Sequence, residues 1–324
     1  MEYGLGKRVP LIDKEIYTLG VAVFLLYFVL PYKNLPAEIL IYGLGAVSFN
    51  IILGFTGMLS FGHGAFFGTG AYTTGLLLKH LGWHPLISLL CAAISGMITA
   101  FLMGIFSIKR IGLYFVMLTL AFNQLAFFIT YQWKHLTGGD DGLLNVPRPD
   151  LSIIFGFKFS IQSNFHFFLF VWVIFMISMI IIRRVLRSPF GRILVAIKED
   201  SDRARAVGYN IMNYKLIAFI ISGGFTGISG GLYALFMKMV PITAIELLTS
   251  TDFIIMSLLG GIGSLYGPVL GAIIVKTASE VISAFWPRWL LPLGLIFIIF
   301  VIFMRGGVWA FLTTILIRMK SGKN

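Results

Sequence analysis

Charged residues are scarce in this sequence, and acidic residues are the scarcest of them. Of the 324 residues, 12% are charged, with 25 Lys and Arg against 13 Asp and Glu, whereas 58% are hydrophobic. Many apolar runs are long enough to cross about 30 Å of hydrocarbon, which excludes an ordinary soluble domain. We therefore expect a polytopic membrane protein in contact with lipid. The net charge of +12 then sets its orientation and does not indicate nucleic-acid binding.

Cysteine is almost absent as well. Cys91 is the single cysteine and lies inside an apolar run, so no disulfide framework and no cysteine-based metal site is expected. The sequence also lacks the pattern Gly-x-x-x-x-Gly-Lys-Ser/Thr, which cradles nucleotide phosphates. We therefore expect no catalytic residue, no metal and no bound cofactor, and any ATP must be bound by another subunit. No small-residue cleavage pattern follows the first apolar run, so that run is expected to be a retained span.

The apolar runs predict an all-α, polytopic transmembrane helical bundle of about ten spans, within a range of about 8–11. If the N-terminus is cytoplasmic, 17 of the 25 Lys and Arg face the cytoplasm and 7 face outward, which favours an N-in/C-in topology. Residues 1–324 then form a single transmembrane domain. Within it, 183–212 is a cytoplasmic loop, 133–164 an extracytoplasmic loop and 305–324 an interfacial C-terminal tail. The expected spans lie near 16–31, 37–54, 64–81, 86–107, 111–132, 165–182, 213–237, 251–262, 264–285 and 289–304.

Glycines interrupt two of these expected spans. The segment after Asn50 is broken by Gly54-Phe-Thr-Gly57 and Gly62-His-Gly64, and the segment after Asp252 by Gly260-Gly-Ile-Gly263. Broken helices occur in membranes only where protein or a water-lined cavity satisfies the freed backbone groups. The breaks therefore mark a candidate pathway. The polar residues expected to face the interior near it are Asn50, Ser60, His63, Asn123 and Gln124.

Each of these interior residues also has a structural interpretation. A hydrogen-bonded structural role is favoured for His63, and the amide side chains face either substrate or another helix. Lys276 and Glu280 lie four residues apart in one expected span and are predicted to neutralise each other. Glycines at a spacing of four predict close helix packing, which is favoured over substrate contact. They are Gly64 and Gly68, then Gly223, Gly227 and Gly231, and finally Gly263, Gly267 and Gly271.

A charged, helix-forming segment at 191–208 separates two long apolar runs. Asp200 or Ser201 is expected as its N-cap, and Gly208 stands where a left-handed residue ends a helix. Such a helix has about two turns and is marginal in water, so it needs something to pack on. We expect a docking element for a soluble partner and not a plain solvated loop. Its candidate coupling residues are Glu199, Asp200, Asp202, Arg203, Ala204, Arg205 and Gly208.

Seven motifs, several of which include segments described above, occur in order within about residues 40–308. They are Gly54-Phe-Thr-Gly-Met-Leu-Ser-Phe-Gly-His-Gly-Ala-Phe-Phe-Gly-Thr-Gly-Ala-Tyr72, Thr137-Gly-Gly-Asp-Asp-Gly142, Arg187-Ser-Pro-Phe-Gly-Arg192, Ala196-Ile-Lys-Glu-Asp200, Ala204-Arg-Ala-Val-Gly208, Lys215-Leu-Ile-Ala-Phe219 and Gly260-Gly-Ile-Gly-Ser-Leu-Tyr-Gly-Pro268. Together they resemble the permeases of branched-chain amino acid ABC importers, of the LivM type. Residues 202–208 are similar to the coupling motif that begins Glu-Ala-Ala, with Asp-Arg in place of Glu-Ala.

The resemblance implies a transport subunit of a prokaryotic cytoplasmic (inner) membrane and not an enzyme. Its implied partners are a second homologous permease, two cytoplasmic ATPase subunits and an extracytoplasmic binding protein that delivers Leu, Ile or Val. Gly138, Gly139, Asp140 and Asp141 are then candidates to meet the binding protein or the substrate ammonium, although polar turn residues are the simpler interpretation.

Several alternatives remain open. Similar permeases serve urea, short amides or other amino acids, so the substrate is not fixed. A secondary transporter or channel also uses broken helices, but it needs no capped cytoplasmic helix. An intramembrane serine protease, suggested by Gly227-Ile-Ser-Gly230, is disfavoured because no histidine follows His166 in the sequence.

Overall fold

The computed structural model describes residues 14–29, 32–152, 158–285, 291–292, 294–295, 297–298 and 307–311. Almost all of this part is α-helical. The helices are α1 (Lys14–Val29), α2 (Leu35–Thr56), α3 (His63–Leu81), α4 (Pro85–Ser107), α5 (Leu113–Gln132), α6 (Lys134–Thr137), α7 (Asn164–Arg187), α8 (Pro189–Glu199), α9 (Ser201–Ala206), α10 (Ile211–Met237), α11 (Leu247–Gly260) and α12 (Gly267–Phe285). Two 3₁₀ turns, η1 (Gly139–Asp141) and η2 (Ile242–Ile245), and one antiparallel pair, β1 (Leu151–Ser152) with β2 (Lys158–Phe159), complete it.

Six of the described helices are long and apolar enough to cross a membrane, namely α2, α4, α5, α7, α10 and α12. The predicted all-helical, multi-pass bundle is thereby confirmed. The count of about ten spans stays a prediction, because α1 and α11 have 16 and 14 residues and α3 ends in a polar last turn. The N-in/C-in topology also stays a prediction. The span expected at 289–304 and most of the tail at 305–324 lie outside the described residues.

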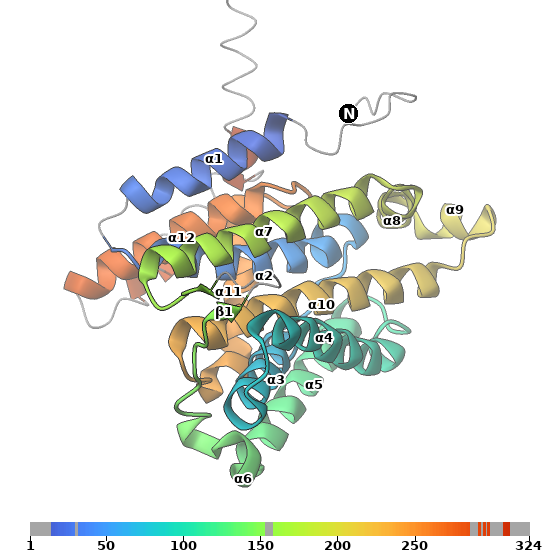
Figure 1. The fold of residues 1–324 in the computed structure, drawn as a ribbon. Helices are drawn as coiled ribbons and strands as arrows, with labels where there is room; N and C mark the ends of the chain where they lie inside the picture. The colour runs from blue at the N-terminus through green and yellow to red at the C-terminus, as the bar shows by residue number, and fades with distance from the viewer. Residues whose placement is uncertain are drawn as a thin grey trace, which may run out of the picture.

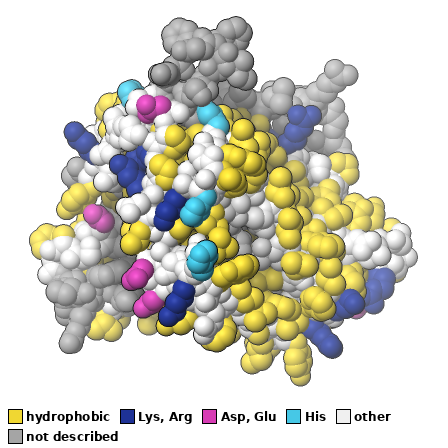
Figure 2. Space-filling view, turned by 60° about the horizontal axis from the view of Figure 1, so that its bottom comes forward, with side chains coloured by type: hydrophobic (Ala, Val, Ile, Leu, Met, Phe, Trp, Pro, Cys, Tyr) yellow, Lys and Arg dark blue, Asp and Glu magenta, His cyan; other side chains and the backbone are white. Residues whose placement is uncertain are grey.

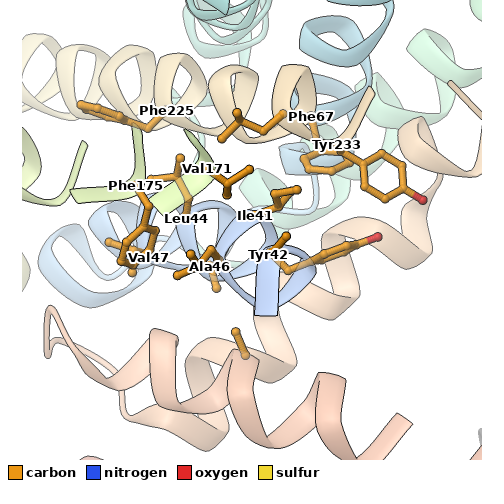
Figure 3. Close-up of a cluster of buried hydrophobic side chains, with 14 of the residues drawn as sticks. Ile41, Tyr42, Leu44, Ala46, Val47, Phe67, Val171, Phe175, Phe225 and Tyr233 are labelled. Carbon is orange, nitrogen blue, oxygen red and sulfur yellow. The ribbon is translucent and has the colours of Figure 1, made fainter. Parts of the chain in front are cut away.

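α10 and α2 form the centre of the bundle. α10 packs against α4, α3 and α2, while α12, α11 and α7 pack against other sides of α2 (Figure 1). α2 is apolar all around, and 19 of its 22 residues are buried, as expected for a helix enclosed by others. Figure 3 shows its side chains Ile41, Leu44 and Val47 among aromatic and aliphatic neighbours from α3, α7 and α10.

α4 shows how the sequence divides a helix between core and lipid. Its inner face is small, with Gly96, Ala100 and Gly104 buried against the bundle. On the opposite face every fourth residue is a large hydrophobic side chain that is more than half exposed: Leu90, Ile94, Ile98, Leu102 and Phe106. A stripe of this size would be unfavourable in water but suits the hydrocarbon of a bilayer.

Polar and apolar side chains separate on the surface of the molecule. Figure 2 shows hydrophobic side chains across the centre and right of one face, with histidine and acidic side chains towards its left and Lys and Arg side chains at both its left and its right. α8 and α9 follow α7 at one end of the bundle, on the right in Figure 1. This distribution is that of a membrane protein with polar ends.

Candidate translocation and coupling site

The first glycine-rich break lies between α2 and α3. α2 continues through Gly54, so the break is confined to residues 57–62 and is shorter than the sequence predicts. Gly57 follows the helix with φ of 73°, a left-handed conformation that glycine adopts without strain. Ser60 is fully buried inside the break, where its hydroxyl accepts the N–H of Gly62 at 3.1 Å. Ser60 therefore stabilises the break itself.

Side chains from two other helices satisfy the free N–H groups at the start of α3. The N–H of Gly64 donates to Ser250 Oγ of α11 at 2.6 Å, and the N–H of Ala65 donates to Asn123 Oδ1 of α5 at 2.6 Å. Asn123 also donates from Nδ2 to the carbonyl of Ile245 at 3.1 Å. A helix that begins within a membrane needs such partners because no water is there to supply them. Asn123 therefore faces the interior and holds three elements together.

The second break lies between α11 and α12, and Asn50 ties it to α2. Gly261 and Gly263 have φ of 122° and 79°, so this turn depends on glycine. The N–H of Gly263 donates to Asn50 Oδ1 at 3.1 Å, and Asn50 Nδ2 donates to the carbonyl of Ser264 at 2.7 Å. One side chain in the central helix thus fixes the backbone of the second break.

His63 is packed at the contact between α3 and α10. Its Nε2 lies 2.8 Å from Ser222 Oγ, and its ring meets those of Phe49 and Phe66 edge-on, with centroids 4.9 and 5.2 Å away. The residue is fully buried. His63 is thus held by packing and one hydrogen bond in this conformation, and its part in transport stays a prediction.

Two polar positions differ from expectation. Gln124 is exposed on α5, because one step along a helix turns by about 100° and carries it away from the buried Asn123. Lys276 does not pair with Glu280, since its Nζ lies 2.9 Å from Glu38 Oε1 of α2. Spacing along a single helix gave the wrong partner because α2 packs closely against α12.

The glycines of α10 allow it to approach α4 closely. A Cβ at Gly223 would meet the side chain of Ala100, and a Cβ at Gly227 would meet the carbonyl oxygen of Ala92. Gly231, two turns beyond Gly223, faces both α3 and α4. Such approach of two backbones recovers the roughly 1 kcal/mol that each glycine costs in a helix.

The other predicted glycine positions lie at contacts of a more mixed kind. Gly64 and Gly68 of α3 face η2 and the residue that follows it, and Gly271 of α12 faces the backbone of α11. Gly267 is the first residue of α12. Gly263 lies outside any helix, so the predicted helical stripe of three glycines is reduced to two members.

α8 anchors the charged segment to the bundle and was not predicted. Ser188 is extended, because the residue before a proline is disfavoured in helical geometry, and Pro189 then opens a new helix at a position where its missing N–H has no cost. Leu194 is fully buried in one cluster with Ile52 of α2 and Phe219 of α10. The apolar spacing after Pro189 was the available sequence signal for this helix.

Lys198, near the end of α8, is bonded to the first break. Its Nζ donates to the carbonyl of Gly54 at 2.8 Å. Gly54 lies in the last turn of α2, where carbonyls lack helical partners and a cation is favoured. Asn50 lies one turn earlier, so a chain of contacts joins α8 to both breaks. No sequence pattern indicated this contact, because Lys198 is one of eight basic residues in that loop and its neighbours.

α9 is the capped helix that its sequence predicts. Asp200 is the N-cap and accepts the N–H of Arg203 at 2.9 Å, and Gly208 follows the helix with φ of 99°. Ala204 is buried. The remaining candidate coupling side chains, Glu199, Asp202, Arg203 and Arg205, are exposed.

Apolar side chains are exposed directly beside these charges. Val207, Tyr209 and Met212 are 72%, 39% and 44% exposed. Apolar groups clustered at a polar end of a membrane protein are covered neither by lipid nor by the core, and such patches mark protein contacts. α9 and its flanks therefore have the character of a docking surface.

The Gly-Gly-Asp-Asp segment forms a tight turn around η1, in the loop before α7. Gly138 and Gly139 have φ of 83° and 64°, which explains why both are glycine. Asp140 and Asp141 are exposed. This turn can therefore meet another molecule without refolding.

Arg148 fastens the same loop to the end of α10. Its Nε and Nη2 donate to the carbonyls of Leu235 and Phe236, each at 2.8 Å, and the guanidinium carbon lies 3.9 Å from the centroid of the Phe167 ring. Burial lowers the pKa of Arg148 to about 10, so the side chain stays protonated at neutral pH. The clamp adds to the backbone bonds of Leu143 with Val240 and of Val146 with Lys238, which hold the same loop against the end of α10.

The helical bundle, its two broken segments and the docked charged segment define a multi-pass membrane permease. A family model described as "Branched-chain amino acid transport system / permease component" matches residues 33–305, and the chain belongs to this family. The resemblance seen in the sequence is therefore confirmed.

Individual relatives agree with this assignment. The chain is similar to the "High-affinity branched-chain amino acid transport system permease protein LivM" of Salmonella typhimurium, with 28% identity covering 88% of this chain and 71% of the relative. The protein of the same name from Escherichia coli is 28% identical, covering 83% and 68%. The permease protein LivH of Salmonella typhimurium is 23% identical, covering 75% and 82%. No solved structure matches the chain.

Proposed function

We propose that this chain is the membrane-spanning permease subunit of an ATP-driven importer for leucine, isoleucine and valine. Membership of the family supports the transport role, and the names of the LivM relatives support the substrate class. The structural observation that carries the mechanism is the contact between Lys198 and Gly54, which joins a docking segment to the broken helices.

The proposed complex contains a second permease and two cytoplasmic ATPases, with an extracytoplasmic binding protein that delivers the amino acid. The similarity of one chain to both LivM and LivH proteins supports a pair of homologous, non-identical permeases. The sequence carries no phosphate-binding motif, so ATP hydrolysis is assigned to the ATPase subunits. This chain is then a transport subunit and not an enzyme.

We place both termini in the cytoplasm of a prokaryote, with the protein in its inner membrane. Residues 183–212 are then the cytoplasmic coupling loop, and residues 133–164 lie outside the cell. The distribution of Lys and Arg supports this orientation. α7 separates the two loops and is long and apolar enough to cross the membrane between them.

In the proposed mechanism, closure of the ATPases pushes on residues 199–208. α8 moves with α9, and Lys198 transmits the motion to the end of α2. Asn50 carries it to the second break, so the two broken segments shift together and face the two sides of the membrane in turn. ATP thus changes the relative stability of two arrangements of the same bundle.

The experiment that tests the assignment is purification of the tagged chain from its native membrane in mild detergent, with partners identified by mass spectrometry. We expect an ATPase and a second permease in the complex. Intact oligomers of this chain without an ATPase would contradict the importer and indicate a secondary transporter or channel.

A further inference from the structure

A charged pocket lies away from the coupling segment, between α2, α11 and α12. Its volume is about 250 Å³, and its walls include Glu38, Asp252, Lys276, Ser279 and Glu280. α11 and α12 are the two helices joined by the second glycine-rich break. A movement of that break therefore changes the shape of this pocket.

The charges of the pocket are unbalanced. Lys276 Nζ lies 2.9 Å from Glu38 Oε1 and 3.2 Å from the centroid of the Tyr42 ring, and both of these charged side chains are largely buried. Asp252 and Glu280 are half-buried, and within the described ranges neither forms an ion pair or a side-chain hydrogen bond. Three carboxylates thus face one ammonium group. Unpaired charges in apolar helices of a membrane protein are costly and mark ligand or ion sites.

The pocket is also placed to receive a ligand from the side opposite the ATPases. Glu38 lies in the first turn of α2, whereas Gly54, which binds Lys198, lies in its last turn. Sixteen residues of helix separate them, or roughly 24 Å at 1.5 Å per residue. In the proposed topology this end of α2 is the extracytoplasmic one.

We propose that this pocket binds a free α-amino acid, with its ammonium group at Asp252 and Glu280 and its carboxylate at Lys276. This inference rests on the proposed function and names the site of that substrate. The Lys276 ammonium has three hydrogens; Glu38 and the face of the Tyr42 ring occupy two directions, so the third hydrogen can be donated to a ligand carboxylate. Val275 supplies the apolar part of the pocket wall for an aliphatic side chain, and the Tyr42 ring, which lies beside Tyr233 in Figure 3, packs under the Lys276 ammonium. In this position each charge of the zwitterion lies beside a side chain of opposite charge.

The test measures equilibrium binding of radiolabelled leucine to the purified permease–ATPase complex without binding protein. Leucinamide, which lacks the carboxylate, and 4-methylpentanoate, which lacks the ammonium group, serve as competitors. We expect Asp252→Asn to weaken leucine binding by about tenfold or more, since a hydrogen bond to a charged group is lost. Competition by 4-methylpentanoate, which has no group for Asp252, should change by less than twofold. Glu280→Gln provides a second variant on the same side of the pocket.

Asp150→Asn, which removes an exposed carboxylate from the outer loop, is the matched control and should bind leucine as the wild type does. Unchanged leucine affinity in both pocket variants, in a complex that still imports leucine, would overturn this inference alone. Binding of Na⁺ to the wild-type complex that Asp252→Asn abolishes, with leucine affinity intact, would also overturn it in favour of a cation site. Absence of leucine uptake by the wild-type complex would overturn the proposed function and this site with it.

Discussion

Single side chains join the elements that move together in the proposed mechanism. Lys198 joins α8 to the carbonyl of Gly54, and Asn50 joins α2 to Gly263 and Ser264. Both residues bond to backbone groups that a helix end or a break leaves free. Such bonds fix the position of one element against another, whereas apolar contacts alone allow sliding.

We predict that Lys198→Met lowers the number of leucine molecules imported per ATP hydrolysed by about threefold or more, because the lost bond involves a charged donor worth roughly 1.5–3 kcal/mol. The ratio is measured in proteoliposomes that contain the complete importer. Lys109→Met, which removes an exposed lysine elsewhere on the chain, should leave the ratio unchanged. Equal ratios for both variants would contradict the role of Lys198.

At the residue scale, the polar residues chosen from the sequence were mostly buried as predicted, whereas spacing along one helix did not predict the ion-pair partner of Lys276. Asn50, Ser60, His63 and Asn123 are buried as predicted, because a polar side chain facing lipid is unfavourable. Gln124 is exposed instead, because successive residues of a helix point about 100° apart and Asn123 takes the buried direction. The true partner of Lys276 comes from a helix more than 200 residues away, which no local spacing reveals.

Whole elements in this bundle approach one another through glycine. α10 meets α4 along Gly223 and Gly227, and the backbones there are too close for a side chain on either residue. The same spacing of four residues predicted this packing from the sequence. α8 was not predicted as a separate helix, although Pro189 stands at the first helical position, where a proline is well suited.

We predict that Gly227→Ala destabilises the protein by roughly 1–3 kcal/mol, as overpacking of a tight contact does. The added methyl group meets the backbone carbonyl of Ala92, which cannot move without the helix. Gly224→Ala is the matched control one turn earlier, since its neighbour is the flexible end of Met97. The unfolding temperatures of the two variants in detergent give the comparison, and a lower value for Gly224→Ala would refute this explanation.

At the scale of the whole molecule, the proposed topology places the two polar ends of the bundle on opposite sides of a membrane. Composition and apolar runs were sufficient to predict a multi-pass helical bundle. They were insufficient for the number of spans, because α3 and α11 are short or partly polar helices that are buried by other helices and not by lipid. Length and hydropathy measure compatibility with lipid, and a helix enclosed by protein need not meet that criterion.

The topology predicts opposite labelling of the two loops. In a background with Cys91→Ser, Asp202→Cys should react with a membrane-impermeant maleimide in inside-out vesicles alone. Asp140→Cys should react in intact cells or spheroplasts. Both positions are exposed, so access depends on the side of the membrane. Labelling of both from the same side would contradict the proposed orientation.

The most direct test of the central claim is uptake of radiolabelled leucine by proteoliposomes that contain this chain with its co-purifying permease and ATPases. Liganded binding protein is supplied on one side and ATP on the other. The account predicts accumulation of leucine that requires ATP and the binding protein and is unaffected by collapse of the proton and sodium gradients. Accumulation without ATP, driven by an ion gradient, would contradict it.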